Sequence, residues 1–352
     1  MDVAPVTVEE LQLATRNHGM PLEALRWPVT PVGLHYLLIH YDVPLVDEGA
    51  WRLTVDGEVE APVELSLDEL RALPAHEVVA TFECAGNGRA RFEPRPVSQP
   101  WLQEAVGTGR WRGARLRDVL ALARPGERAL EVVFTGLDRG VEGGEEQDYR
   151  RSLSLGAARD DDVLLAYELN GGPLPPQHGH PLRLLVPGWY GMTNVKWLAR
   201  VTVTTEPFTG YQQARGYRLR TTDEEEGTPV ELVLPRALMV PPGIPDFMSR
   251  DRVLPAGAVA IEGRAWSGHG EVEEVEVSTD GGVSWSAARL GPSDLGRWAW
   301  RHWTYTWEAE PGEHELACRA RDAAGNEQPL APAWNVGGYA NNAVQRVRVT
   351  VR

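Results

Sequence analysis

Cys84, one of two cysteines in 352 residues, lies between a predicted strand and a glycine-rich turn. The strand covers residues 77–82, where apolar and β-branched residues dominate. Gly86-Asn87-Gly88 then favours a sharp turn, since these residues tolerate positive φ angles. A thiolate presented there is a soft metal ligand, and Arg89 can hold an anion beside it. The alternative is an inert cysteine packed in a core.

The segments that must position this loop follow the pattern of a mixed α+β domain. Two capping boxes, Thr7 to Glu10 and Ser66 to Glu69, each predict the start of a helix, and Gly19 is the expected end of the first. A polar loop is expected after Asp138. Apolar and β-branched runs predict a further helix at 116–123 and strands at 34–40, 51–57, 130–135, 162–169, 181–187 and 195–204.

The carboxy-terminal third has an all-β pattern. Residues 206–255 are rich in proline and predict a linker with short pieces of structure. Strands are expected at 272–277, 298–307 and 313–321, with a hairpin turn at 280–282, which indicates a β-sandwich resembling the immunoglobulin fold. Cys318 is predicted to be a core residue. The expected domains are 1–206 and 207–352.

Four tryptophans fall in the predicted strand 298–307. Because side chains alternate along a strand, not all of them can enter one core. We therefore expect part of this aromatic surface to be buried against the other domain or against a second chain. The four are Trp298, Trp300, Trp303 and Trp307.

Charge and composition narrow the possible partners. The net charge of −15 argues against nucleic acid or an anionic membrane, and no apolar run is long enough for a membrane span. Residues 1–5 carry no export signal, and two distant cysteines are typical of reduced thiols, so a cytoplasmic protein is expected. There is no Cys-x-x-Cys-His motif, so no haem is expected and electrons must pass to an external acceptor.

The string Cys84 to Arg89 resembles the molybdenum-binding loop Cys-Ala-Gly-Asn-Arg-Arg of the sulfite oxidase family. The resemblance runs from about residue 30 to the carboxy terminus and implies a mixed α+β molybdenum-cofactor domain followed by an immunoglobulin-like dimerisation domain. It also implies a molybdopterin cofactor, a thiolate bond from Cys84 to molybdenum, and a homodimer.

The same resemblance assigns further site residues. Around the metal it implies an anion-binding Arg89 with Trp101 and Tyr217. For the pterin and its phosphate it implies Tyr36, His40, Asp138, His178, Arg183, Asn194, Val195 and Lys196.

This chain departs from the family pattern at three positions. Two pocket arginines of the family are replaced by Leu38 and Gly337, and Gly88 replaces a third arginine in the cysteine loop. Losing two charge-assisted donors would remove about 3–6 kcal/mol of anion stabilisation, so weak sulfite binding is expected. Arg16 would restore a cation only if its segment folded back onto the pocket.

The function predicted from these residues is two-electron oxygen-atom transfer, with sulfite to sulfate the leading candidate. One alternative keeps the cofactor but uses a less charged sulfur or nitrogen compound, in either direction. Another is a cysteine hydrolase in which Cys84 is the nucleophile and His178 or His40 the base. A third is a non-catalytic β-sandwich binding protein.

Overall fold

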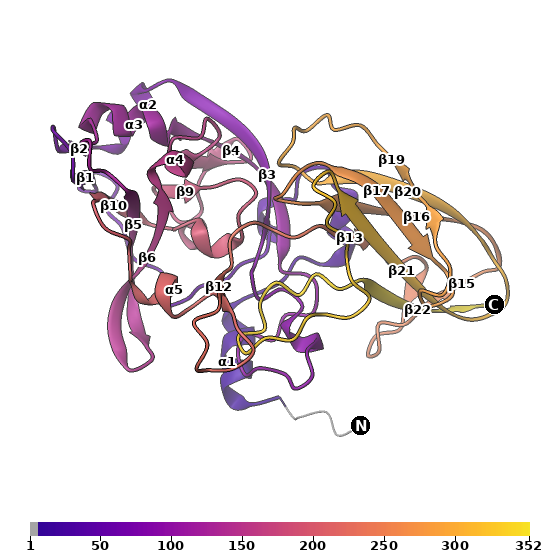
Figure 1. Ribbon diagram of the computed structural model, residues 1–352. Coiled ribbons are helices and arrows are strands. Elements are labelled where there is room, and N and C mark those ends of the chain that lie inside the picture. The colour runs from indigo at the N-terminus through magenta and orange to yellow at the C-terminus, as the bar shows by residue number, and fades with distance from the viewer. Residues whose placement is uncertain (1–5) are drawn as a thin grey trace.

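A computed structural model describes residues 6–352, and the predicted lack of an export signal at residues 1–5 lies outside them. Figure 1 shows two parts side by side, which we call the N-terminal part (residues 6–235) and the sandwich (residues 236–352). Within residues 6–352, none of the helices is both long and apolar enough to cross a membrane.

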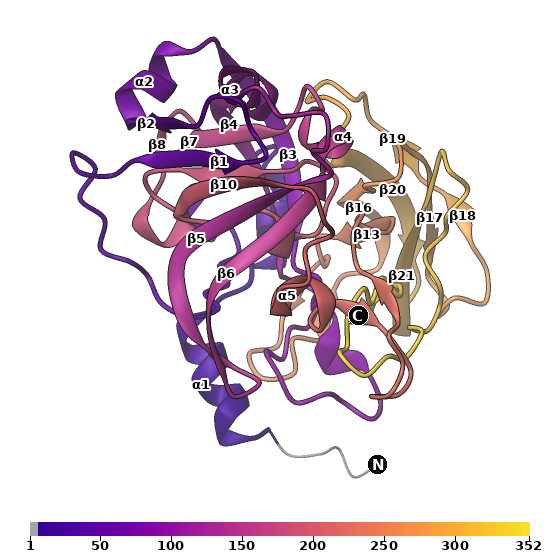
Figure 2. The ribbon, with the colours of Figure 1, turned by 60° about the vertical axis from the view of Figure 1, so that its left-hand side comes forward.

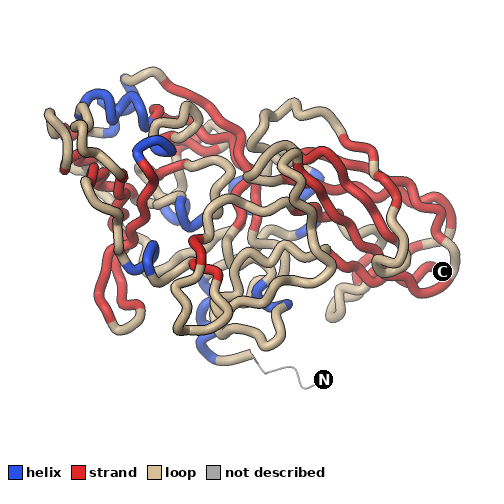
Figure 3. The backbone as a smooth tube through the Cα atoms, in the orientation of Figure 1, coloured by secondary structure: helices blue, strands red, loops and turns tan. Residues whose placement is uncertain are grey.

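The helices are short, as the blue segments of Figure 3 show. Both predicted capping boxes are confirmed: Thr7 accepts from the backbone of Glu10, and Ser66 from that of Glu69. The first helix ends at Arg16 rather than at Gly19, because the next residue is already extended. The α-helices in the described residues are α1 (Val8–Arg16), α2 (Leu67–Ala72), α3 (Leu116–Ala123), α4 (Leu155–Ala158) and α5 (Tyr211–Ala214).

Two sheets build the N-terminal part, and Figure 2 shows the strands of the first lying side by side. The first has the order β2 (Val63–Leu65), β1 (Leu53–Gly57), β10 (Leu198–Thr204), β5 (Glu131–Glu142) and β6 (Glu145–Ser154). The second has the order β3 (Ala75–Glu83), β4 (Val106–Arg115), β7 (Leu164–Leu169) and β8 (Gly172–Pro173), with β9 (Arg183–Leu185) also paired to β7. One apolar core contains side chains of both sheets together with α2 and α3.

Two further sheets enclose the core of the sandwich. One has the order β13 (Arg236–Met239), β16 (Gly257–Trp266), β20 (Arg301–Ala309) and β19 (Arg289–Leu290). The other has the order β14 (Ile244–Pro245), β15 (Arg252–Leu254), β22 (Gln345–Val351), β21 (Gly312–Asp322), β17 (Val272–Ser278) and β18 (Ser286–Ala287). Cys318 is fully buried in this core, as predicted. The short pair β11 (Arg218–Leu219) and β12 (Thr228–Pro229) lies near the end of the N-terminal part, shortly before the sandwich begins.

Two segments of the N-terminal part differ from the prediction. Residues 34–40 do not form a strand: they follow a 3-10 turn at Val32–Leu34, and only Leu37 pairs, in a single bridge with His18. The predicted polar loop after Asp138 is instead the continuation of β5. The chain turns back at Gly143–Gly144, whose φ angles of 61° and 80° suit a hairpin into β6.

The aromatic segment 298–307 is divided between two environments. Its strand, β20, begins only at Arg301, and Trp303 and Trp307 of that strand enter the sandwich core. Trp300 packs into the core of the N-terminal part, and its Nε1 donates to the carbonyl of Pro28 at 2.7 Å. The prediction that part of this surface is buried against the other domain is therefore confirmed.

A buried ion pair joins the two parts. Glu83, the last residue of β3, lies 2.8 Å from the Nε of Arg236 on β13, and both side chains are about 1% exposed. Trp266 Nε1 donates to the same carboxylate at 2.8 Å, as does Asn87 Nδ2 at 3.1 Å. Burial raises the pKa of Glu83, and these three partners oppose that effect. The sandwich thus supplies the charge that allows a carboxylate to be buried beside Cys84.

We expect Arg236→Met to lower the free energy of unfolding by about 3–5 kcal/mol, because it leaves Glu83 buried without its cation. The free energy of unfolding can be measured by urea titration with tryptophan fluorescence as the signal. The matched control is Arg348→Met, which removes an exposed pair with Asp251 and should change stability by about 0–1 kcal/mol. Equal effects of the two substitutions would contradict a structural role for the buried pair.

Candidate active site

The Cys84 loop begins where β3 ends. The backbone N–H of Cys84 donates to the carbonyl of Ala105 at 2.9 Å, and Asn87 closes a turn onto the Cys84 carbonyl at 2.9 Å. Gly88 has a φ of 87°, which favours glycine. At Gly86 a Cβ atom would lie 2.6 Å from the Arg89 guanidinium, so only glycine lets the arginine fold back beside the cysteine.

Residues that precede β22 hold this loop from the sandwich side, and Figure 1 shows this yellow segment reaching the N-terminal part. The N–H of Ala340 donates to the carbonyl of Ala85, and Asn341 Nδ2 to that of Gly88, each at 2.8 Å. Arg89 Nε donates to the carbonyl of Gly337 at 3.1 Å. The two parts therefore build the loop together.

Two hollows meet at Cys84. The first, the inner cavity, has a volume of about 50 Å³. The second, the outer pocket, has a volume of about 290 Å³ and is partly open to solvent. Both are lined by Cys84, Leu38, His40 and Tyr217. A group bound to the thiol can thus face the inner cavity on one side and a substrate on the other.

Several buried polar atoms of the inner cavity have no hydrogen-bond partner among residues 6–352. They are Asp138 Oδ1, His35 Nε2 and Arg183 Nε, all from residues that line the cavity. Burial raises the pKa of Asp138, and Lys196 opposes this. Because orphaned buried polar atoms are costly, this set fits a bound molecule with its own donors and acceptors. His35 was not predicted, and nothing in its sequence context apart from its neighbour Tyr36 marks it.

Arg183 is buried beside two aromatic rings, those of Phe82 and Trp111, which stack on each other. Its guanidinium carbon lies 5.2 Å from the centroid of Phe82 and 4.8 Å from that of Trp111. Its Nη1 and Nη2 donate to the carbonyls of His178 and Asn194 at 3.0 and 3.1 Å. It makes no ion pair with a carboxylate within residues 6–352. Its positive charge is therefore left for an anion in the cavity.

Lys196 is the only lysine in the chain. Its Nζ donates to the carbonyls of Leu38 at 2.8 Å and Gln177 at 3.2 Å, which aims the ammonium into the inner cavity. Burial lowers the pKa of Lys196, Arg183 lowers it further, and Asp138 raises it. An anionic group bound here would offset the unfavourable burial of two cations.

Some of the other residues predicted to contact the pterin line the inner cavity, and others stabilise the loop that forms it. Tyr36, His40 and His178 line the inner cavity, and Tyr36 packs its hydroxyl against Gly191. Burial lowers the pKa of His40 to about 3 and that of His178 to about 2, so both rings are neutral.

Asn194 and Val195 mainly support the loop that they belong to. The Asn194 side chain accepts from the N–H of Val186 at 2.7 Å and donates to the carbonyl of Tyr190 at 3.3 Å, although Asn194 also lines the cavity. Val195 is buried in the apolar core and is not part of the cavity wall.

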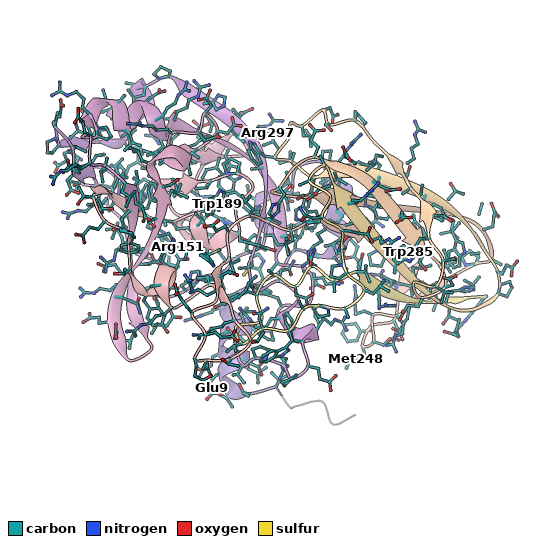
Figure 4. All side chains as sticks on the ribbon, viewed as in Figure 1. Glu9, Arg151, Trp189, Met248, Trp285 and Arg297 are labelled. Atoms are coloured by element: carbon teal, nitrogen blue, oxygen red, sulfur yellow. The ribbon has the colours of Figure 1, made fainter. Side chains whose placement is uncertain are left out.

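The predicted metal-side residues meet at the outer pocket. Arg89, Trp101 and Tyr217 all line it. The hydroxyl of Tyr217 lies 2.6 Å from His40 Nε2, and its ring lies 5.7 Å from the guanidinium carbon of Arg151, which Figure 4 labels beside α5. Arg151 also donates to the carbonyl of Gln212 in α5, so it holds α5 and the nearby Tyr217 in place. The segment that follows β10 therefore positions Tyr217 at the pocket.

Arg16 also reaches the outer pocket, from the last turn of α1. Its Nη2 donates to the carbonyl of His40 at 3.1 Å. The segment does fold back, so the pocket contains two arginines, Arg16 and Arg89. This changes the expectation of weak sulfite binding, because one of the two missing cations is replaced from elsewhere in the chain.

Tyr339 is a pocket residue that the sequence did not predict. A Cβ atom on Gly337 would lie 2.2 Å from the Tyr339 ring, so this ring occupies the space of the missing side chain at 337. The ring centroid lies 5.0 Å from that of Tyr217 and 5.2 Å from the guanidinium carbon of Arg89. No motif marks this tyrosine, because its position depends on the sandwich contacting the cysteine loop.

Family models match most of the chain. Residues 40–212 match the oxidoreductase molybdopterin binding domain, and residues 239–352 match the Mo-co oxidoreductase dimerisation domain. Sulfite oxidase of Gallus gallus is 40% identical over 343 residues, which cover 90% of this chain and 72% of that protein. Mitochondrial sulfite oxidase of Mus musculus is 39% identical over 339 residues, which cover 92% of this chain and 62% of the mouse protein.

The NADH nitrate reductase of Hordeum vulgare is 35% identical over 352 residues, which cover 92% of this chain but 38% of that protein. Among solved structures, the sulfane dehydrogenase SoxCD from Paracoccus pantotrophus aligns with a TM-score of 0.82, covering 100% of this chain and 89% of that chain at 24% identity. This likeness confirms the predicted α+β cofactor fold followed by a β-rich domain. The chain belongs to the sulfite oxidase family of molybdopterin-dependent oxidoreductases.

We expect Lys196→Met to lower the molybdenum and pterin content of the purified protein, because it removes one of the cations of the inner cavity. Lys196→Arg keeps the charge and should retain more cofactor. Elemental analysis and pterin fluorescence measure the content, and activity is then divided by molybdenum. Full loading with collapsed activity per molybdenum would place Lys196 in the substrate pocket instead.

Proposed function

We propose that this protein catalyses two-electron oxygen-atom transfer between water and a small sulfur oxyanion, with sulfite to sulfate the leading reaction. The observation that carries the proposal is the position of Cys84 between two hollows of different character. The inner cavity offers unpaired polar atoms and two buried cations, and the outer pocket offers two arginines.

The inner cavity fits a molybdopterin, because its free groups complement a pterin with a phosphate. Asp138 is suited to accept from pterin N–H groups, and His35 can donate or accept. Arg183 and Lys196 are suited to the anionic phosphate. No group of three or more His, Cys, Asp or Glu in residues 6–352 could hold a metal ion, so a metal at Cys84 needs ligands from such a cofactor.

Bound molybdenum cofactor supplies the two-electron redox chemistry, and the protein supplies binding and electrostatics. Arg89 and Arg16 hold the oxyanion by charge-assisted hydrogen bonds. The Tyr217 hydroxyl, fixed by His40, orients a substrate oxygen, and Trp101 closes the wall. Sulfite and water give sulfate, two protons and two electrons, which pass to an external acceptor.

The alternatives from the sequence have less support. A cysteine hydrolase needs a base at the thiol, and within residues 6–352 neither His40 nor His178 hydrogen-bonds to Cys84. A binding protein without catalysis leaves the inner cavity and its cations without a purpose. A nitrogen compound as substrate, in the reductive direction, is the remaining alternative, and the lower identity to nitrate reductase favours sulfite.

Assembly and location also stay proposals. We propose a homodimer formed through residues 239–352, because this region matches a dimerisation domain. We also propose, from the sequence alone, that the protein is cytoplasmic and carries no haem. Light scattering at micromolar concentration should give twice the mass of one chain. A monomeric mass across that range would contradict the dimer.

Replacing Cys84 with Ser should abolish sulfite oxidation, because a mostly protonated hydroxyl is a poor substitute for a thiolate ligand. The wild-type protein should contain close to one molybdenum per chain. The matched control is Cys318→Ala, which alters the other buried cysteine and should retain activity per molybdenum. An active Cys84→Ser enzyme, or a wild type free of molybdenum from cofactor-competent cells, would refute the proposal.

Arg16→Ala should raise the KM for sulfite roughly tenfold to hundredfold, which corresponds to one charge-assisted hydrogen bond of about 1.5–3 kcal/mol. Arg16→Lys should recover part of the loss. Steady-state assays with ferricyanide measure both, and Arg128→Ala, an exposed arginine paired with Glu58, serves as the control. If Arg16→Ala leaves KM unchanged, Arg16 does not bind the substrate.

A further inference from the structure

The outer pocket is larger and more apolar than an inorganic oxyanion requires. A sulfite ion has one sulfur and three oxygens, whereas the pocket has a volume of about 290 Å³. Besides the arginines and Tyr217, much of its wall is aliphatic or aromatic. The residues concerned are Leu13, Leu38, Ile39, Trp101, Val141 and Tyr339.

The pocket has few donors to offer an anion. Arg89 Nε is bound to the Gly337 carbonyl, and its Nη1 to Ser98 Oγ and the Gln99 carbonyl, so within residues 6–352 only Nη2 lacks a hydrogen bond. Arg16 uses its own Nη2 on the carbonyl of His40. The donors that remain free can bind one or two oxygens of an anion better than all three oxygens of sulfite.

A carboxylate in the same pocket disfavours additional negative charge. Glu142 lines the outer pocket, and its Oε2 accepts from the Tyr41 hydroxyl at 3.0 Å and from Gln212 Nε2 at 2.6 Å. A monoanion is therefore accommodated better than a dianion such as sulfite.

Tyr339 supplies a fixed aromatic face beside the anion site. Asn335 accepts from its N–H and donates to its carbonyl, both at 2.9 Å, which holds the backbone in place. Its ring centroid lies 5.2 Å from the guanidinium carbon of Arg89 and 5.0 Å from the ring centroid of Tyr217. An aromatic ring next to a guanidinium suits a ligand with an oxyanion head and an apolar body.

We infer that the outer pocket accepts organic sulfinates, monoanions R–SO₂⁻ with an aromatic or short aliphatic R, and that Tyr339 determines this specificity. The inference rests on the proposed function. The reaction is R–SO₂⁻ + H₂O → R–SO₃⁻ + 2H⁺ + 2e⁻. The sulfur lone pair forms one new S–O bond, the two O–H bonds of water break, and no bond to sulfur is lost. The protons go to solvent, and two electrons reduce two molecules of an external one-electron acceptor such as ferricyanide.

The test compares benzenesulfinate with sulfite on the molybdenum-loaded holoenzyme, with ferricyanide as acceptor. We expect kcat/KM for benzenesulfinate to lie within about tenfold of that for sulfite. In H₂¹⁸O, mass spectrometry should find benzenesulfonate with one labelled oxygen. Tyr339→Ala should lower the ratio of the two kcat/KM values, sulfinate over sulfite, by about tenfold, whereas Tyr339→Phe keeps the ring and should preserve the ratio.

Each of the other possible results would contradict either the inference, the proposed function or the role of Tyr339. Oxidation of sulfite but not of benzenesulfinate overturns the inference and leaves the proposed function standing. Failure to oxidise either substrate by fully loaded enzyme overturns the proposed function. Unlabelled sulfonate, or sulfonate formed equally by the Cys84→Ser protein, means uncatalysed oxidation and also overturns the inference. An unchanged ratio in Tyr339→Ala overturns the role of Tyr339.

Discussion

Glu83 and Arg236 form an ion pair between two parts of the chain, with both side chains about 1% exposed. Neither charge is tolerable alone at that depth, since an unpaired buried charge costs several kcal/mol. The pair therefore forms only when β3 and β13 are packed together. Because Glu83 directly precedes Cys84, this requirement ties the geometry of the cysteine loop to the docking of the sandwich.

The same contact completes the chemistry of the site. The carbonyl of Gly337 positions Arg89, the amide of Asn341 holds Gly88, and the ring of Tyr339 forms part of the pocket wall. A domain that matches a dimerisation module thus also contributes to the outer pocket.

The charge distribution separates the two hollows at Cys84. Within residues 6–352, the two cations of the inner cavity make no ion pair with a carboxylate, while the outer pocket combines two arginines with a carboxylate and an apolar wall. The first arrangement suits a permanently bound anionic group, because burying cations is favourable only with a lasting counter-charge. The second suits an anion that binds and leaves again.

The features that the sequence by itself determined are local ones. The Cys84 turn, the capping boxes of α1 and α2, helix α3 and the alternating strands follow from neighbouring residues, whose backbone preferences act over a few positions. The family resemblance could also be found from the sequence, because it lies in short motifs such as those around Cys84 and Lys196.

Only the tertiary structure decided which distant residues share the pocket. Arg16 enters it because α1 ends beside His40, 24 residues later in the sequence, and Arg89 meets Gly337 across 248 positions. The segment 34–40 has the composition of a strand, but its backbone does not join a sheet, and its side chains line the site. Such placements depend on long-range packing and burial of charge, which local sequence preferences do not encode.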